Sequence, residues 1–319
     1  MLIALVCGLL IIVAVLGGML AFGTKAPPPP LASIGEPFTH VDFSDLPKIE
    51  TTTSRNGPIA FRQWRPSNPD AQDVVIAVHG SSASSTSLHP LAKALSAQGM
   101  LVYAPDIRGH GETGRRGDID YPAELDDDMT DFVAAVRAQH PHARLVLLGF
   151  SSGGGYALHV VALPLGKSFA RTVLISPMLG IDAPTVRQDL QIWAVAYVPR
   201  IIAISVLDRV GIHAFDYLPV LAFAVSPKQA EYLTQYYSFR LMNAFGTADY
   251  AADLRNASSP MAVLVGEKDE LFDASKFPST VAAIRSDVPV TIVPGLNHIE
   301  MTTDPRAIPA IVGAIRGTP

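Results

Sequence analysis

The chain has 319 residues, enough for one large domain or two modest ones. Hydrophobic residues make up 49% of it and charged residues 17%, so we expect a folded protein with a sizeable core. A formal net charge of -5 leaves no basic excess, which argues against a nucleic-acid partner. The single cysteine, Cys7, excludes an internal disulfide and a cysteine-based metal site.

The first 24 residues contain no charged side chain and are almost wholly apolar. About 22 residues at roughly 1.5 Å of helix rise each would span about 33 Å, enough to cross a bilayer core. A cleaved signal peptide is the alternative, but such peptides begin with basic residues and have a shorter apolar core. We therefore expect residues 1–24 to be a retained single-pass membrane anchor. Lys25 alone is too little charge asymmetry to assign the side of the membrane.

Residues 25–37 follow as a proline-rich linker that contains four consecutive prolines, Pro27 to Pro30. Such a run favours a short, stiff polyproline spacer. We expect it to connect the anchor to one folded domain, residues 38–319.

In this domain, short apolar runs typical of strands alternate with amphipathic stretches of helical length. Glu124–His140 is one such stretch, with an acidic start that suits the positive end of a helix dipole. Continuous apolar strands that alternate with helices predict an α/β fold, with a mainly parallel sheet covered on both faces. The predicted strands are Pro58–Arg65, Val74–Gly80, Leu101–Asp106, Arg144–Ser151, Arg171–Pro177, Met261–Asp269 and Pro289–Pro294.

The alternation breaks once, between residues 178 and 246. Two apolar runs, Ile192–Leu207 and Leu218–Val225, lie there without a clear strand–helix rhythm. We interpret this stretch as a helical cap inserted over the catalytic edge of the sheet, whose apolar runs line an acyl-binding site. The alternative is that the runs are ordinary buried core helices.

The sequence GFSSG, residues 149–153, matches G-x-S-x-G with Ser151 at its centre. It follows the predicted strand LVLLGF and precedes the helical stretch GGGYALHVVAL. In this context a sharp strand-to-helix turn lifts the serine hydroxyl out of the sheet, and the flanking glycines avoid a clash. We therefore predict Ser151 as a nucleophile rather than an incidental serine in a glycine-rich turn.

A serine nucleophile needs a base, and the base needs a carboxylate to orient it. Among the nine histidines, His298 lies just after the last predicted strand, in a loop that can reach the serine. Asp269 ends the preceding strand at the same sheet edge. Asp273 is the rival acid, while Glu267 and Glu270 are weaker because neighbouring positions on a strand end point elsewhere.

Acyl transfer also needs two backbone N–H groups directed at the developing negative charge, an oxyanion hole. We predict one from Ser152, directly after the nucleophile. The other is expected from the loop after the strand Val74–Gly80, with the Ser81 N–H as first choice and that of Ser82 as second. His79 in this loop is interpreted as a structural turn residue.

Together these motifs resemble the α/β-hydrolases of the monoacylglycerol lipase, lysophospholipase and S33 serine-aminopeptidase group. The chain order Ser151, Asp269, His298 is the order of that fold. The resemblance implies that Asp106, Arg108 and His110 shape the sheet edge near the site. Relatives often carry a second glycine after the His-Gly pair, where this chain has two serines. The matching pieces are VHGSS (78–82), APDIRGHGETG (104–114), GFSSGG (149–154), GEKDELFD (266–273) and GLNHIE (295–300).

The expected function is hydrolysis of carboxylic esters through an acyl-enzyme on Ser151. The apolar anchor and cap favour small-molecule esters with an acyl chain, of the monoglyceride or lysophospholipid type. Nothing in the sequence indicates a metal or an organic cofactor, and nothing indicates an oligomeric state. The alternatives are a catalytically silent binding protein on this fold, and an S33-type peptidase that holds a substrate amine with acidic cap residues. The candidates for that role are Asp182, Asp189, Asp208, Asp216 and Glu231.

Overall fold

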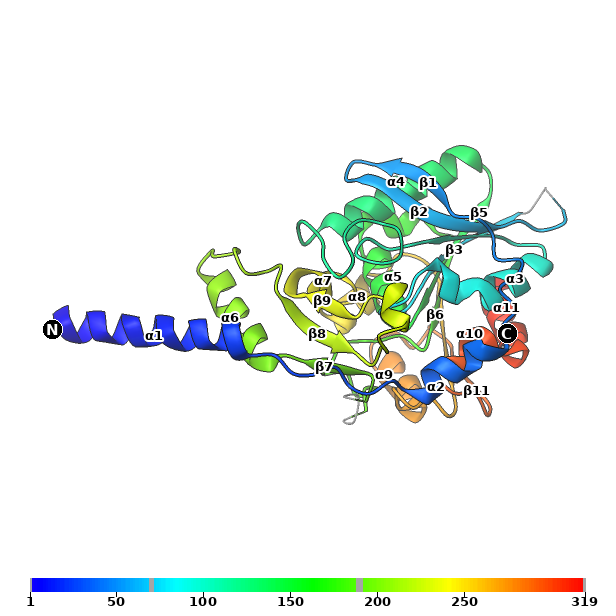
Figure 1. Ribbon diagram of the computed structural model, residues 1–319. Helices are drawn as coiled ribbons and strands as arrows, with labels where there is room; N and C mark the ends of the chain where they lie inside the picture. Colours follow the sequence, from blue (N-terminus) through cyan, green and yellow to red (C-terminus); the bar gives the residue numbers. More distant parts are fainter. Residues whose placement is uncertain (1, 69–71, 188–191, 318–319) are drawn as a thin grey trace.

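The computed structural model describes residues 2–68, 72–187 and 192–317, and its main body is built on one large sheet (Figure 1). Eight strands form this sheet in the order β1-β2-β4-β3-β5-β6-β10-β11. The pairs β1–β2 and β2–β4 are antiparallel, and the other neighbours are parallel. The strands are β1 Glu50–Ser54, β2 Gly57–Trp64, β3 Asp73–Val78, β4 Leu101–Pro105, β5 Arg144–Phe150, β6 Arg171–Ile175, β10 Met261–Gly266 and β11 Val290–Val293.

All the predicted strands are present, and each ends earlier along the chain than its apolar run suggested. In the parallel strands, the terminal residues of those runs leave the ladder and form the loops at the carboxyl edge of the sheet. β1 was not predicted, because its sequence ETTTS is polar and most of the strand is exposed to solvent. The mainly parallel sheet is confirmed.

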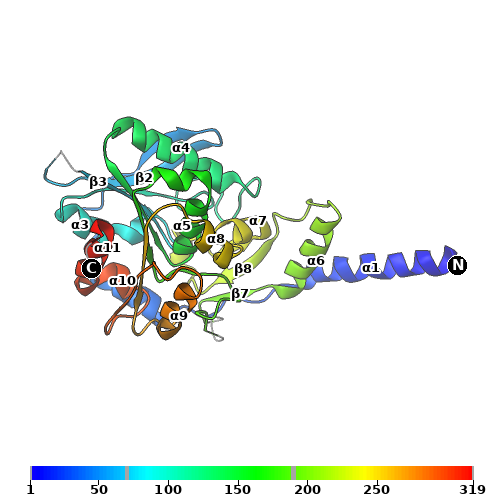
Figure 2. The same ribbon diagram turned by 180° about the vertical axis from the view of Figure 1, so that it is seen from behind.

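Helices cover both faces of the sheet, as predicted (Figures 1 and 2). One face packs against α4, α5, α8 and α9, and the other against α3, α10 and α11. Their bounds are α3 His89–Ala97, α4 Glu124–Gln139, α5 Ser152–Ala162, α8 Tyr250–Asn256, α9 Phe277–Ala282, α10 Glu300–Thr303 and α11 Ile308–Arg316.

The first helix, α1 (Leu2–Phe22), projects away from this body (Figures 1 and 2). It is long and apolar enough to cross a membrane, and none of its most apolar stretch is buried in the protein. After α1 the chain returns along the body and forms α2 (Ala32–Gly35) and a short 3-10 helix, Glu36–His40.

The insertion between β6 and β10 is mixed, so the expectation of a helical cap was wrong in part. It contains a small antiparallel sheet in the order β7-β8-β9. Its elements are β7 Ala194–Ala196, α6 Val198–Arg209, β8 Pro219–Phe223, β9 Tyr236–Ser238 and α7 Phe239–Ala244. A short apolar run does not distinguish strand from helix. Within Ile192–Leu207 the division falls at Tyr197, between β7 and α6, and Pro199 lies in the first turn of α6, where proline is well tolerated.

An ion-pair cluster joins three helices on one face of the sheet. His159 of α5 lies 3.2 Å from an Asp126 carboxylate oxygen of α4 and 3.5 Å from an Asp253 carboxylate oxygen of α8. Its hydrogen bonds with Asp126 and Asp253 outweigh partial burial and raise the pKa of His159 to about 10. The imidazolium is therefore the native form at neutral pH.

Replacing His159 with Leu should lower the free energy of unfolding by about 1–2 kcal/mol at pH 7, less than the full pKa shift implies because solvent screens the cluster. The raised pKa makes this stabilisation fully present below pH 6.5, and it is lost as the pH rises towards 10. In denaturant unfolding, the free energy of unfolding of His159→Leu should therefore be lower than that of wild type at pH 7, and the difference should be smaller at pH 10. His142→Leu, which removes an exposed histidine, is the control. An equal loss of unfolding free energy at both pH values for His159→Leu would contradict this explanation.

Candidate active site

Ser151 occupies a strained turn between β5 and α5. Its φ is 57° and its ψ is -122°, a conformation that a residue with a side chain rarely adopts. The two flanking glycines make the turn possible. A Cβ at Gly149 would collide with the Gly153 carbonyl oxygen, and one at Gly153 would collide with the His79 carbonyl oxygen of the neighbouring loop. The glycine positions of the motif are therefore required by close backbone approach, as predicted.

Asp269 and His298 meet at the same edge of the sheet. The His298 Nδ1 lies 2.8 Å from the Asp269 Oδ2, and both side chains are buried. The other Asp269 oxygen accepts hydrogen bonds from the backbone N–H groups of Leu271 and Phe272, at 3.0 and 2.9 Å. Burial by itself would raise the pKa of Asp269, but the His298 charge and these hydrogen bonds bring it below its ordinary value. The carboxylate is therefore ionised and fixes the proton on Nδ1 of His298, which leaves Nε2 free to accept one.

The other acidic candidates do not contact the imidazole. The Asp273 side chain accepts from the backbone and hydroxyl of Ser275, at the start of a short 3-10 helix. Glu270 accepts the His298 backbone N–H at 3.0 Å, and Glu267 accepts the Gly295 N–H at 2.8 Å. These two glutamates hold the loop that carries the histidine.

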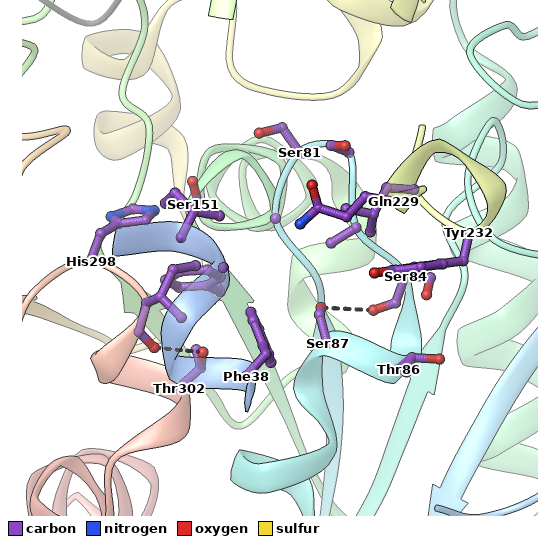
Figure 3. A pocket seen from close by; sticks show the side chains of 18 of the residues that line it. Phe38, Ser81, Ser84, Thr86, Ser87, Ser151, Gln229, Tyr232, His298 and Thr302 are labelled. Carbon is purple, nitrogen blue, oxygen red and sulfur yellow. Dashed lines mark hydrogen bonds between the residues drawn. The ribbon is translucent and has the colours of Figure 1, made fainter. Parts of the chain in front are cut away.

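Ser151 and His298 line the same cavity, and Figure 3 shows the imidazole beside the serine. Among the hydrogen bonds of the described residues, none joins the Ser151 hydroxyl to His298. Catalytic hydrogen bonds are often long in a ligand-free site and shorten when substrate is bound.

The loop after β3 places Ser81 and Ser82 across from the serine. The Ser82 N–H donates to the Tyr237 hydroxyl at 2.7 Å, so it is already paired. The Ser81 hydroxyl accepts from the indole N–H of Trp193 in the cap at 3.0 Å. Among the described hydrogen bonds, none uses the Ser81 N–H. This arrangement favours Ser81 over Ser82 as the expected oxyanion donor.

A buried, uncharged network holds this loop. The Tyr237 hydroxyl of β9 donates to Nε2 of His110, whose Nδ1–H donates to the Ile107 carbonyl oxygen at 3.1 Å. The Ile107 N–H donates to Nε2 of His79 at 3.1 Å, and Nδ1–H of His79 donates to the Gly80 carbonyl oxygen at 2.8 Å. Burial lowers the pKa of His79 below its ordinary value and that of His110 well below it. Both histidines are neutral, and the contacts of His79 are those of a structural turn residue.

The remaining residues of the DIRGHG segment also make structural contacts. Asp106 accepts the backbone N–H groups of Ser85 and Glu112, at 2.7 and 3.0 Å. Arg108 pairs with Asp128 of α4 at 2.6 Å. Neither side chain lines the cavity of Ser151.

The cavity has a volume of about 590 Å³ and is formed by three parts of the chain. The loops at the sheet edge supply Ser151, His298 and the serines of the β3 loop. The cap supplies Trp193, Gln229, Tyr232 and Leu233, and the segment after α1 supplies Ile34, Gly35, Phe38, Thr39, Phe43 and Leu46. None of the described lining residues is Asp, Glu, Lys or Arg.

One expectation about the cap was wrong. Trp193 is the only described residue of the runs Ile192–Leu207 and Leu218–Val225 that lines the cavity, so these runs do not form its wall as expected. The acidic cap residues Asp182, Asp208, Asp216 and Glu231 do not line it either, and Asp189 lies outside the described residues. The contribution of residues 34–46 was missed, because they were assigned to a linker and the start of the domain. The only signal in the sequence was the recurrence of apolar residues at Leu31, Ile34 and Phe38, with helical spacing.

Tyr237→Phe should reduce kcat/KM for p-nitrophenyl acetate by about ten- to a hundredfold, since it removes the acceptor that holds the Ser82 N–H and small displacements of a donor loop are costly. Tyr236→Phe on the same strand is the matched control, because Tyr236 is partly exposed and has no such contact. Equal rates for Tyr237→Phe and Tyr236→Phe would show that the network does not position the loop.

Comparison with known proteins agrees with this geometry. Residues 69–306 match the family described as serine aminopeptidase, S33. The chain is 27% identical over 274 residues to a monoacylglycerol lipase of Mycolicibacterium smegmatis, which covers 78% of this chain and 88% of the relative. Human monoglyceride lipase is 31% identical over 142 residues, 44% of this chain and 45% of the relative.

Among solved structures, a soluble variant of monoglyceride lipase from Saccharomyces cerevisiae superposes with a TM-score of 0.65 at 15% sequence identity, covering 87% of this chain and 96% of that chain. This likeness shows the α/β-hydrolase fold. With the match over residues 69–306, it identifies the chain as a serine hydrolase that belongs to the S33 family of α/β-hydrolases.

Proposed function

We propose that the protein hydrolyses carboxylic esters of neutral acyl lipids, monoacylglycerols above all, with Ser151, His298 and Asp269 as its catalytic triad. The observation that carries the proposal is the cavity of about 590 Å³ that contains Ser151 and His298 and has no Asp, Glu, Lys or Arg among its described lining residues. The similarity to lipases from a bacterium, a yeast and human points to the same substrate class.

In the first step, the Ser151 Oγ attacks the ester carbonyl carbon while Nε2 of His298 takes the hydroxyl proton. The Asp269 carboxylate, 2.8 Å from Nδ1, stabilises the imidazolium that forms. The tetrahedral intermediate then expels the alcohol, which receives the proton from His298. A water molecule attacks the acyl-enzyme in the same way, with His298 as base, and releases the carboxylic acid and free Ser151.

The oxyanion of both intermediates is bound by the N–H groups of Ser152 and Ser81. Ser152 begins helix α5, so its N–H has no partner within the helix and the positive end of the helix dipole lies beside it. The Ser81 N–H comes from the loop held by Trp193 and the Tyr237 network.

The absence of charged lining residues from the described part of the cavity discriminates between the candidate substrates. A peptidase that trims free N-termini needs a carboxylate to bind the amine, and a lysophospholipid carries a phosphate that basic groups would pair. Neither group is among the lining residues that the structure describes. A glycerol ester needs only hydrogen-bonding hydroxyls and amides, which the serines of the β3 loop and Gln229 provide. The close Asp269–His298 pair also argues against a catalytically silent protein.

We further propose that α1 is a retained membrane anchor. Arg200 of α6 is buried, and its guanidinium donates to the Leu20 carbonyl oxygen and to the Pro219 carbonyl oxygen, both at 2.8 Å. Gly23 packs so closely that a Cβ there would lie 2.9 Å from the Arg200 backbone nitrogen. Cleavage of α1 would remove the Leu20 acceptor of Arg200 and the helix that packs against this part of α6. Near this junction, Val198 and Ile202 of α6 are about half exposed, at 51% and 48%, which suits contact with a lipid surface.

The proposed activity is tested by hydrolysis of a monoacylglycerol in mixed micelles. Ser151→Ala and His298→Ala should each lower kcat by about a thousandfold or more, and the double variant should lose little beyond that, because triad members act as one unit. Asp269→Asn should also lower kcat strongly. Circular dichroism should show that each variant is folded.

A matched lysophospholipid with the same acyl chain is the comparison substrate. The wild-type enzyme should prefer the monoacylglycerol by at least about tenfold in kcat/KM, since nothing in the described cavity pairs the phosphate. Full activity of Ser151→Ala would contradict the triad. Preference for the lysophospholipid, or for an aminoacyl substrate, would contradict the neutral-lipid assignment.

The anchor is tested by membrane fractionation of the full chain and by the mass of its mature N-terminus. The protein should remain in the membrane fraction after carbonate extraction and retain residues 1–24. A chain that begins at Ala26 should be released into the soluble fraction. A mature protein that lacks the first helix would identify α1 as a signal peptide.

A further inference from the structure

The segment that follows α1, residues 31–46, contributes a large part of the cavity wall. Of the ten large apolar or aromatic side chains that line the cavity in the described structure, four come from this segment: Ile34, Phe38, Phe43 and Leu46. The cap supplies three, Trp193, Tyr232 and Leu233. Figure 3 shows Phe38 in the wall below Ser151, in the same view as His298 and Thr302.

Several contacts fix this segment to the body of the protein. The Phe43 ring stacks on His89 of α3 with 5.6 Å between ring centroids, and the Asp42 carbonyl oxygen lies 3.1 Å from the His89 Nε2. The Trp64 indole N–H donates to Nδ1 of His89 at 3.0 Å, so the histidine proton lies on Nε2, which can donate to Asp42. Asp45 pairs with Lys93 of α3 at 2.7 Å.

The apolar side chains of the segment also join the core. Ile34, Phe38 and Leu46 pack against the cluster formed by α3, α10, α11 and one face of the sheet. Stacking, an ion pair and core packing hold this wall in one geometry. A rigid apolar wall can discriminate between acyl chains of different length.

We propose that residues 31–46 are the acyl-binding wall of the site and set its chain-length preference, an inference that rests on the proposed ester hydrolysis. The occupant is the hydrocarbon chain of the acyl group, because Ile34, Phe38, Phe43 and Leu46 offer it only apolar surface. The same segment is joined to α1 by residues 23–30, and α1 is fixed to the cap through Arg200. The chain therefore runs directly from the membrane helix into the wall that receives the lipid tail.

Gly35 offers a variant that narrows the site without disturbing the core. A Cβ at this position would meet one atom within 4 Å, the Nε2 of Gln229 in the cap, at 3.8 Å. Because Gly35 and Gln229 both line the cavity, a leucine at position 35 would extend into the space between the segment and the cap. Phe38→Ala changes the same wall in the opposite direction, by removing contact area.

The experiment measures kcat/KM of the full-length protein in one fixed detergent for butyryl and dodecanoyl p-nitrophenyl esters. Phe38→Ala should lower the dodecanoyl-to-butyryl ratio by about tenfold, as expected from lost contact with two methylenes. Gly35→Leu should lower it as well, by blocking the longer chain. Val41→Ala, in the same segment but outside the cavity, and Ile202→Asp, on the exposed face of α6, should keep the wild-type ratio.

The possible results separate this inference from the proposed function. If the wild-type protein hydrolyses neither ester, the proposed function fails. If it hydrolyses both and Ser151→Ala does not, the function stands and the ratios decide the inference. An unchanged ratio in folded Gly35→Leu and Phe38→Ala overturns the assignment of the acyl wall. A ratio lowered by Ile202→Asp but by neither of these two variants would place the acyl site in the cap.

Discussion

The close approach of helix α5 to the loop after β3 is the constraint on which the site depends. Gly153 lies against the His79 carbonyl oxygen, and Gly149 against the first turn of α5, so neither can carry a Cβ. With the backbone fixed this way, Ser151 is held at φ 57° with its hydroxyl at the cavity. The same approach brings the N–H of Ser152 and the loop with Ser81 to one place. Strain at Ser151 is thus stabilised by backbone packing that also assembles the surroundings of this proposed nucleophile.

The sequence places the candidate site residues at one edge of the sheet because its signals are local or are tied to the ends of strands. GFSSG specifies its own turn chemistry, and Asp269 and His298 follow buried apolar runs that form β10 and β11. In a parallel sheet such positions gather at one edge, so chain order and strand ends bring together residues that are 118 and 29 positions apart, and the structure places Asp269 and His298 within 2.8 Å. The strand ends were predicted too late, because polar residues such as His79, Asp106 and Asp269 follow the apolar runs directly and lie in the loops beyond the ladder.

The cavity walls could not be predicted in the same way, since they depend on contacts between distant segments. Ile202 and Leu221 both belong to apolar runs, yet neither of them lines the cavity, whereas Phe38 lines it. Hydrophobicity shows that a residue avoids water, but not whether it packs in a core, faces a bilayer or meets a substrate. Tyr237 and Trp193 support the β3 loop from the cap across more than a hundred residues of sequence, through single hydrogen bonds that leave no local pattern.

The most direct test of the proposed site is a crystal structure of the protein after reaction with a long-chain alkyl fluorophosphonate. We expect one arrangement of atoms around the covalent adduct. The phosphorus should be bonded to the Ser151 Oγ, with the phosphonyl oxygen about 2.7–3.1 Å from the backbone nitrogens of Ser81 and Ser152. The His298 imidazole should lie beside the adduct with its bond to Asp269 intact. An adduct on another serine, or a phosphonyl oxygen bound by neither N–H group, would contradict the account.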